Sequence, residues 1–244
     1  MATYGDLLKI IEDTLVENDM TETICTHMDE CRKEYTNAIF GLFLEASKGI
    51  GLVCKGIEML AFTQVGTLLR QLYEQMATAV VLLNHPETRK MFNDLSKIKM
   101  ELLRENKKEN EESKLLYNQK KESIDSKTRN YRDFLEYGWL LEIEGCNSLG
   151  SKELLKQANM ADLICWKEFF NNFVHSKIVA IQMTGQGMEF YTNEFIYHTA
   201  IIFDQYMCAY HRATGYDFCI SGRNVRSNFE KCFKEITNQR NFQQ

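Results

Sequence analysis

The sequence predicts an all-α protein, a single helical bundle with a protruding charged helical hairpin. Proline occurs once in 244 residues, and because proline breaks helix interiors, a chain nearly free of it can form long helices. Residues of high helix propensity, above all Leu, Glu, Lys and Met, are common. No internal repeat and no sharp change in composition divides the chain, so we expect one helical domain over residues 1–244.

The spacing of apolar residues predicts the first three helices. Residues 4–18 carry a single apolar stripe, which is typical of a short amphipathic helix. A second helix is expected to begin near Thr21, where Thr-Glu-Thr supplies capping residues, and to end at the glycines Gly49 and Gly51. A third, over about residues 52–83, is apolar around most of its circumference, which predicts the central helix of the bundle.

A charged segment follows, and Pro86 is expected at the first position of a new helix there. Residues 87–133 are rich in Lys, Arg, Asp and Glu, a composition that fits either a disordered linker or a solvated helical hairpin. Apolar residues such as Leu95 and Ile98 keep a helical spacing through much of the segment. This spacing favours an antiparallel hairpin with a solvated tip near residues 106–113.

Capping and loop residues define the rest of the chain. Asn159 followed by Asp162 resembles a capping box, which predicts the start of a helix. The remaining expected elements are a helix from Arg129 that ends in a loop at residues 145–150, the capped helix closed by residues 185–187, an aromatic helix that ends at Gly215, and a last helix over residues 221–237.

The totals exclude several classes of protein. A net charge of -5 argues against a generally basic nucleic-acid binder, although a local basic patch is compatible with it. No apolar run approaches the roughly 18 residues of a membrane span, and no signal-peptide pattern is visible, so we expect a cytoplasmic protein without membrane contact. The eight cysteines form no CxxC pair and are expected to be free thiols. No metal-ligand spacing and no cofactor motif is present, so we expect neither group.

The segment FFNNFVHSK, residues 169–177, contains the first candidate site residues. His175 and Asn171 are one helical turn apart and can share a face. An imidazole exchanges protons near neutral pH, and an adjacent amide can help to orient a phosphate or a hydroxyl. The alternative, which we weigh equally, is that His175 donates a hydrogen bond to a carbonyl in the core.

A second candidate pair is Arg70 and Glu74 in LLRQLYEQM, residues 68–76. Charges inside an otherwise apolar helix are costly unless they are paired or shared with a ligand. The two residues either form an internal ion pair that fixes helix register, or Arg70 faces a polar pocket toward an anion and is oriented by Glu74. His198, in an apolar stretch, is expected to be a packed imidazole.

Three segments, LLRQLYEQM, the turn NHPET and FFNNFVHSK, carry a family resemblance. Over roughly residues 35–210 the chain resembles an uncharacterised family of bacterial all-helical proteins, which is itself similar to the HEPN superfamily. That resemblance implies helical bundles that are often homodimeric and are often metal-independent ribonucleases of toxin and antiphage systems.

The HEPN signature is an arginine followed after four to six residues by a histidine, commonly with a polar residue directly after the arginine. Asn171 and His175 match the polar position and the histidine. The arginine does not match, because its three allowed places are held by Phe170, Phe169 and Glu168.

Whether the protein is an enzyme therefore stays open. In one hypothesis Arg70 restores the missing guanidinium, holds the scissile phosphate of RNA, and shares a pocket with Asn171 and Glu74. His175 would then act as general base or acid on the ribose 2'-hydroxyl. In the other, the site is degenerate and the protein is a non-catalytic, dimeric helical module that binds RNA, a nucleotide or a protein partner. The charged hairpin and the aromatic helix over residues 190–210 are the surfaces expected to bind such a partner.

Overall fold

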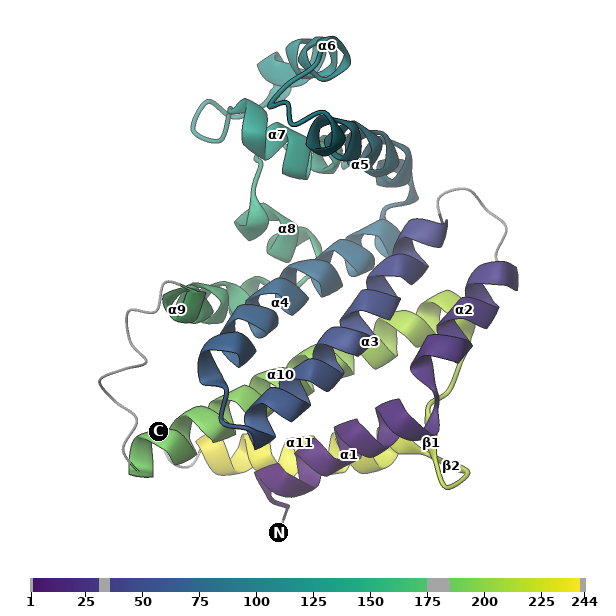
Figure 1. The fold of residues 1–244 in the computed structure, drawn as a ribbon, viewed down its shortest axis with the longest axis vertical. Coiled ribbons are helices and arrows are strands. Elements are labelled where there is room, and N and C mark those ends of the chain that lie inside the picture. Colours follow the sequence, from purple (N-terminus) through teal and green to yellow (C-terminus); the bar gives the residue numbers. More distant parts are fainter. Residues whose placement is uncertain (1, 31–35, 175–184, 242–244) are drawn as a thin grey trace. The chain divides into compact units, whose positions relative to one another are not determined.

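The computed structural model describes residues 2–30, 36–174 and 185–241 (Figure 1). These residues form eleven α-helices, four short 3-10 helices and one two-stranded antiparallel sheet, which confirms the all-α prediction. The chain divides into two compact units. The first comprises Met1–Arg32, Phe40–Met76 and Cys165–Gln244, and the second Lys33–Ile39 and Ala77–Ile164.

The first unit is formed by helices from both ends of the chain and by the small sheet. β1 and β2 pair antiparallel, with Cys219 opposite Asn224. The elements of this unit are α1 (Tyr4–Glu17), α2 (Met20–Glu30), most of α3 (Thr36–Glu58), the first two-thirds of α4 (Phe62–Asn84), α9 (Ile164–Val174), α10 (Gly185–Thr214), β1 (Cys219–Ile220), β2 (Arg223–Asn224) and α11 (Val225–Asn241).

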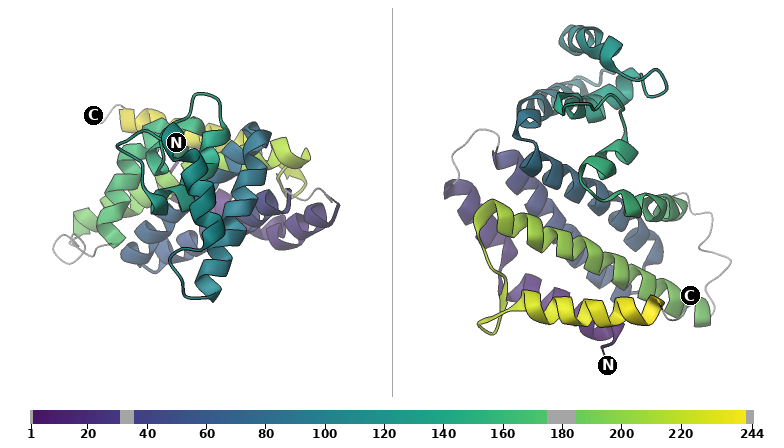
Figure 2. Two further views of the ribbon diagram at one scale, coloured as in Figure 1. Left: turned by 90° about the horizontal axis from the view of Figure 1, so that it is seen from above. Right: turned by 180° about the vertical axis from the view of Figure 1, so that it is seen from behind.

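Helix α1 agrees with the amphipathic helix predicted for residues 4–18. Thr3 and Asp6 form a capping box, in which the Thr3 hydroxyl accepts from the Asp6 amide and the Asp6 carboxylate accepts from the Thr3 amide. The helix buries Leu7 and Ile11 and packs against α10 and α11. Helices α10 and α11 lie near each other in the view from behind (Figure 2). The rings of Phe203 on α10 and Phe229 on α11 are in contact, with centroids 5.4 Å apart.

The predicted boundary between the second and third helices is wrong. Helix α3 continues through Gly49 and Gly51 to Glu58, and the turn follows at Leu60, whose φ of 56° is left-handed. A Cβ on Gly49 would lie 2.8 Å from the Cδ2 of Leu72 on α4. Gly49 therefore permits a close helix–helix contact and does not end the helix.

Helix α3 bears on the prediction that no apolar run approaches the length of a membrane span. Its stretch Asn37–Glu58 is long and apolar enough to cross a membrane, by length and composition alone. The prediction that no stretch reaches this length is therefore wrong. Phe43, Ile50 and Val53 are fully buried in the core of the first unit, and core helices of globular domains pass the same test. The stretch is weak evidence for a membrane span.

The second unit contains the predicted hairpin. Pro86 begins the 3-10 turn that precedes α5, as the sequence suggested. The elements are the last turns of α4, η1 (Pro86–Thr88), α5 (Arg89–Arg104), α6 (Glu111–Lys120), η2 (Lys121–Ser123), α7 (Tyr131–Tyr137), η3 (Gly138–Glu142), α8 (Ser151–Gln157) and η4 (Ala161–Leu163).

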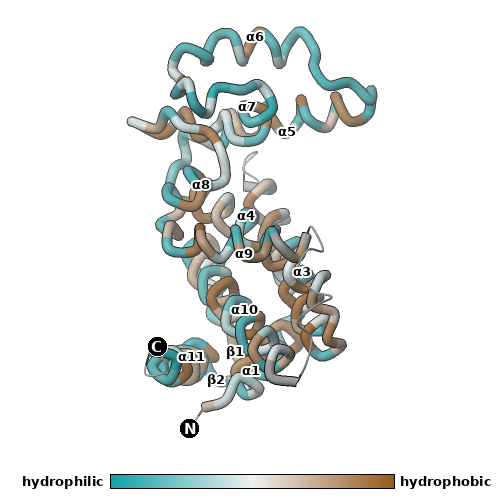
Figure 3. The backbone as a smooth tube through the Cα atoms, turned by 90° about the vertical axis from the view of Figure 1, so that its left-hand side faces the viewer, coloured by the Kyte–Doolittle hydropathy of each residue, from teal (hydrophilic) through white to brown (hydrophobic). Residues whose placement is uncertain are grey.

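The charged segment is helical, as the retained apolar spacing predicted. Helix α5 buries Leu95 and Ile98, and α6 is hydrophilic along most of its length (Figure 3). Ser113, expected in the solvated tip, is fully buried and accepts a hydrogen bond from Tyr131 at 2.5 Å. The solvated connection is therefore shorter than predicted, because α6 begins at Glu111.

Two predicted boundaries near α9 and α10 are also wrong. Asn159 has a φ of 58° and lies in the link after α8, so it caps no helix, and Met160 precedes η4. The glycines of residues 185–187 begin α10 and do not close the preceding helix. Glycine is common beside either end of a helix, so its presence alone does not say which end is there. Gly215 follows α10 with a φ of 74°, as expected. All described cysteines are free thiols.

Candidate functional site

Arg70 and Glu74 lie one turn apart on α4, inside the first unit. Both side chains are half-buried. The Nε atom of Arg70 is buried and has no hydrogen-bond partner among the described residues. An N–H group held away from water without a partner is unfavourable by about 1–3 kcal/mol, and more when the group is charged. This atom is therefore a point where an added acceptor would be favourable.

Glu74 pairs with Lys167 of α9. The Nζ of Lys167 lies 2.5 Å from Oε1 of Glu74, and Lys167 is only 8 % exposed. Lys167 therefore competes with Arg70 for the carboxylate of Glu74, and this contact was not predicted from the sequence. The signal was present in ICWKEFF, where a single lysine stands in an apolar helix.

Two apolar contacts fix how α9 lies on α4. The rings of Tyr73 and Phe170 stack with centroids 6.1 Å apart. At Gly66, an added Cβ would lie 2.7 Å from the Cβ and Cγ of Phe173, so the absence of a side chain there lets α9 approach closely. Later residues of α9 thus meet earlier residues of α4, and the two helices run antiparallel.

Asn171 directly follows Phe170 on α9 and is one turn beyond Lys167, while Arg70 is one turn before Glu74 on α4. We call this region the α4–α9 seam; its residues are Gly66, Arg70, Tyr73 and Glu74 of α4 and Lys167, Phe170, Asn171 and Phe173 of α9.

His175, the proposed acid–base residue, lies outside the described residues. Of the other three predicted site residues, Arg70 and Glu74 lie one turn apart on α4, and Asn171 lies on α9.

A buried histidine lies directly behind the seam. His198 of α10 is 0 % exposed, and its Nδ1 is 2.5 Å from the hydroxyl of Tyr73, which is also fully buried. Burial lowers the pKa of His198 below its ordinary value of 6.5 and raises the pKa of Tyr73 well above 10.0. The neutral imidazole therefore accepts from the tyrosine hydroxyl, and its second nitrogen faces Glu194, whose Oε2 is 3.7 Å away. His198 is a packed imidazole, as the sequence suggested.

The network ends in a paired carboxylate. Both carboxylate oxygens of Glu194 accept from Arg240 of α11, at 2.7 and 3.0 Å, and the guanidinium of Arg240 lies 4.1 Å above the ring of Tyr197. Burial raises the pKa of Glu194, but its interactions with His198 and Arg240 outweigh that effect and hold the pKa below 4.5. This pair ties α11 to α10, and the sequence reading missed it.

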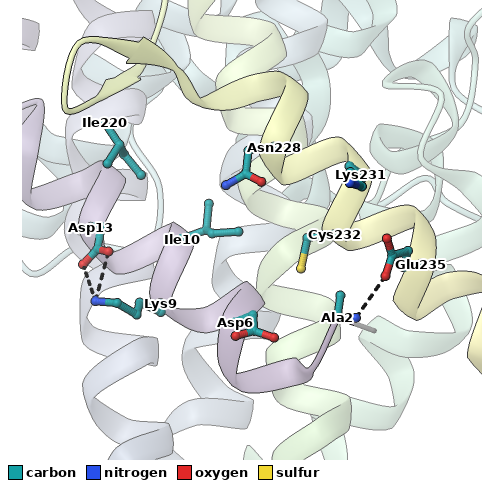
Figure 4. Close-up of a pocket in the computed structure, with 10 residues that line it drawn as sticks. All are labelled: Ala2, Asp6, Lys9, Ile10, Asp13, Ile220, Asn228, Lys231, Cys232 and Glu235. Carbon is teal, nitrogen blue, oxygen red and sulfur yellow. Dashed lines mark hydrogen bonds and ion pairs between the residues drawn. The ribbon is translucent and has the colours of Figure 1, made fainter.

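A separate groove of about 480 Å³ lies between α1 and α11 (Figure 4). Acidic and basic side chains both line it, and several of them are already engaged. Lys9 pairs with Asp13 at 3.1 Å, and Glu235 accepts from the amide of Ala2 at 3.0 Å. The mixed charges give the groove no preference for a ligand of either sign.

Chemically, the seam offers a guanidinium whose Nε has no partner among the described residues, an amide side chain on α9, the Glu74–Lys167 ion pair and aromatic rings. Such a set suits recognition of an anionic group. Among the described residues, no group of three or more His, Cys, Asp or Glu side chains is placed to hold a metal ion.

Comparisons with protein-family models, with curated proteins and with solved structures give no match for this chain. The resemblance to HEPN proteins therefore stays a prediction.

Proposed function

We propose that this protein binds RNA at the α4–α9 seam and cleaves it without a metal ion, as a HEPN-like ribonuclease of a cytoplasmic bacterial toxin or antiphage system. The observation that carries the proposal is the buried Nε of Arg70, which has no hydrogen-bond partner in the part of the chain that the structure describes. This nitrogen keeps hydrogen-bonding capacity for a ligand. Planar bidentate contact with phosphate is the recognition for which arginine is best suited.

The proposed chemistry assigns one role to each residue. Arg70 binds the scissile phosphate and stabilises the charge that develops on it. Asn171 orients the phosphate or the ribose from the facing helix. His175 takes the proton of the ribose 2'-hydroxyl, whose oxygen attacks the phosphorus, and the leaving 5'-oxygen is protonated from an acid or from water. Glu74 acts indirectly, because with Lys167 it fixes the register of the two helices.

The test is cleavage of single-stranded RNA in the presence of EDTA. We expect activity from the wild type, and a loss of about 100-fold or more in both Arg70→Ala and His175→Ala, the range for removing a general acid–base or charge-stabilising group. Arg223→Ala is the matched control, because Arg223 is an exposed arginine on β2.

Binding is measured separately, by fluorescence anisotropy with an RNA analogue that lacks the attacking 2'-hydroxyl. Arg70→Ala should weaken this binding, whereas His175→Ala should retain it. If both folded variants bind and cleave RNA like the wild type, the proposed site is wrong.

A second function, a non-catalytic interaction module, is favoured by one observation on the charged hairpin. Three large apolar side chains of α5 and α6 are strongly exposed: Met100 at 54 %, Leu103 at 73 % and Leu115 at 62 %. Exposed apolar side chains gathered on one segment are typical of a protein-binding surface. This function predicts that Leu103→Ser with Leu115→Ser abolishes capture of a stoichiometric protein partner while RNA binding is absent from the wild type.

A further inference from the structure

The C-terminal end of α11 is held in place by polar contacts. Ile236 is the last buried residue of this helix, and residues 237–241 are all polar. Within this end, Gln239 donates to the carbonyl oxygen of Ala2 at 3.3 Å. Arg240 binds both carboxylate oxygens of Glu194 on α10, at 2.7 and 3.0 Å. The position of the last turn therefore depends chiefly on the Glu194–Arg240 pair.

His198 lies beside the same carboxylate and does not bind it. Its Nδ1 accepts from the hydroxyl of Tyr73, so the proton of the neutral imidazole is on Nε2. This Nε2 is buried and has no hydrogen-bond partner in the part of the chain that the structure describes. The nearest oxygen of Glu194 is 3.7 Å away, too far for a hydrogen bond. Glu194 thus faces two donors, and its hydrogen bonds go to Arg240.

The charge of His198 and the position of Arg240 are linked. Burial lowers the pKa of His198, the Glu194 carboxylate raises it, and the charge of Arg240 lowers it further. If the end of α11 leaves α10, the charge of Arg240 is removed and water can reach the imidazole. The released state therefore binds a proton more readily than the docked state, and protonation favours release.

The surroundings of His198 contain no second group that titrates near neutral pH. Tyrosine hydroxyls and thiols are uncharged at neutral and acidic pH, and arginine keeps its charge. Glu194, whose pKa lies below 4.5, stays ionised above about pH 5. The groups around the imidazole and its Tyr73 partner are Tyr73 of α4, Cys165, Trp166 and Phe170 of α9, Glu194 and Tyr197 of α10, and Arg240 of α11.

We propose that protonation of His198 releases the C-terminal end of α11 from α10. The proton comes from solvent, and the carboxylate of Glu194 turns from Arg240 to the imidazolium, whose Nε2 gains a charge-assisted hydrogen bond. Tyr73 can then no longer donate to Nδ1, so the change reaches the α4–α9 seam. The inference does not depend on RNA binding, because the proposed ribonuclease residues take no part in it.

The test is hydrogen exchange of the full chain at pH 7.5 and pH 5.5, measured by mass spectrometry and corrected for the intrinsic exchange rate. Peptides that cover residues 233–241 should lose protection by about three- to tenfold, because one proton changes an opening equilibrium by at most about tenfold per pH unit. Peptides from residues 91–98 of α5, in the second unit, should keep their protection.

Two variants separate this device from a general effect of acid. His198→Phe should remove the pH dependence at the end of α11. Arg240→Gln should lower protection there at both pH values and show no further loss at pH 5.5, and it decides the matter if His198→Phe does not fold. Arg223→Gln, a change at an exposed arginine on β2, should behave like the wild type. Equal protection of the wild type at both pH values would overturn the proposal, as would a pH dependence that either folded variant retains.

Discussion

Gly66→Ala tests whether α9 is seated on α4 as described. The new Cβ would lie 2.7 Å from the Cβ and Cγ of Phe173 and 3.0 Å from its Cδ2. The Cβ of Phe173 is tied to the backbone of α9, so the helix itself must move. Such overpacking costs about 1–3 kcal/mol. Alanine is favoured over glycine in a helix by about 1 kcal/mol, so we expect the net free energy of unfolding to change by about 0 to −2 kcal/mol.

Gly41→Ala supplies the matched control for this substitution. Gly41 is also inside a helix, α3, but a Cβ added there would have nothing within 4 Å. It should show only the propensity gain of about 1 kcal/mol, which leaves a gap of about 1–3 kcal/mol between the two variants. The assay is urea unfolding followed by the fluorescence of Trp166 on α9, in a background where Trp139, the other tryptophan, is replaced by Phe. Equal stabilisation by both substitutions would refute the α4–α9 contact.

Three further outcomes are expected. Because the folded-state pKa of His198 lies below its ordinary value of 6.5, the unfolded state binds its proton first, so stability should fall as pH drops below about 6.5. Glu194 has a folded-state pKa below 4.5, so the free energy of unfolding should fall again below about pH 4.5. The urea midpoint measured against pH should show both decreases in the wild type. The His198→Phe variant should lack the decrease that begins near pH 6.5. Lys167→Met should lower the free energy of unfolding by about 1–3 kcal/mol, because it removes the Lys167 cation from a half-buried Glu74. The double variant with Glu74→Gln should recover part of the lost stability, which thermal melts measure. Burial raises the pKa of the Cys54 thiol, so mass-mapped alkylation should modify Cys54 only after denaturation. The thiols expected to react in the native protein are Cys25 and Cys165.

The helices could be predicted where local chemistry decides them. Helix α1 has its own cap at Thr3 and its own apolar stripe, and both are visible in a short window of sequence. The end of α3 could not be predicted, because Gly49 has one role in a free helix and another against Leu72 of a neighbouring helix. Only the tertiary contact distinguishes a glycine that ends a helix from one that packs.

The candidate site divides in the same way. Arg70 and Glu74 are recognisable from sequence, since two charges in an apolar helix require partners. Their partners are not recognisable, because Lys167 reaches Glu74 from a helix more than ninety positions later in the chain. The pair of Glu194 with Arg240 is likewise a contact between separate helices. Which charge meets which is set by helix register, and register is a property of the folded unit.

Arg70 is the informative residue of the seam, because its Nε is buried and has no hydrogen-bond partner among the described residues. Lys167, 8 % exposed, pairs with the carboxylate of Glu74, as a nearly buried ammonium requires a counter-charge. Arg70 as a residue is half-buried, while its Nε is closed to solvent, so an anion that bonds to this nitrogen must draw the side chain toward it on binding.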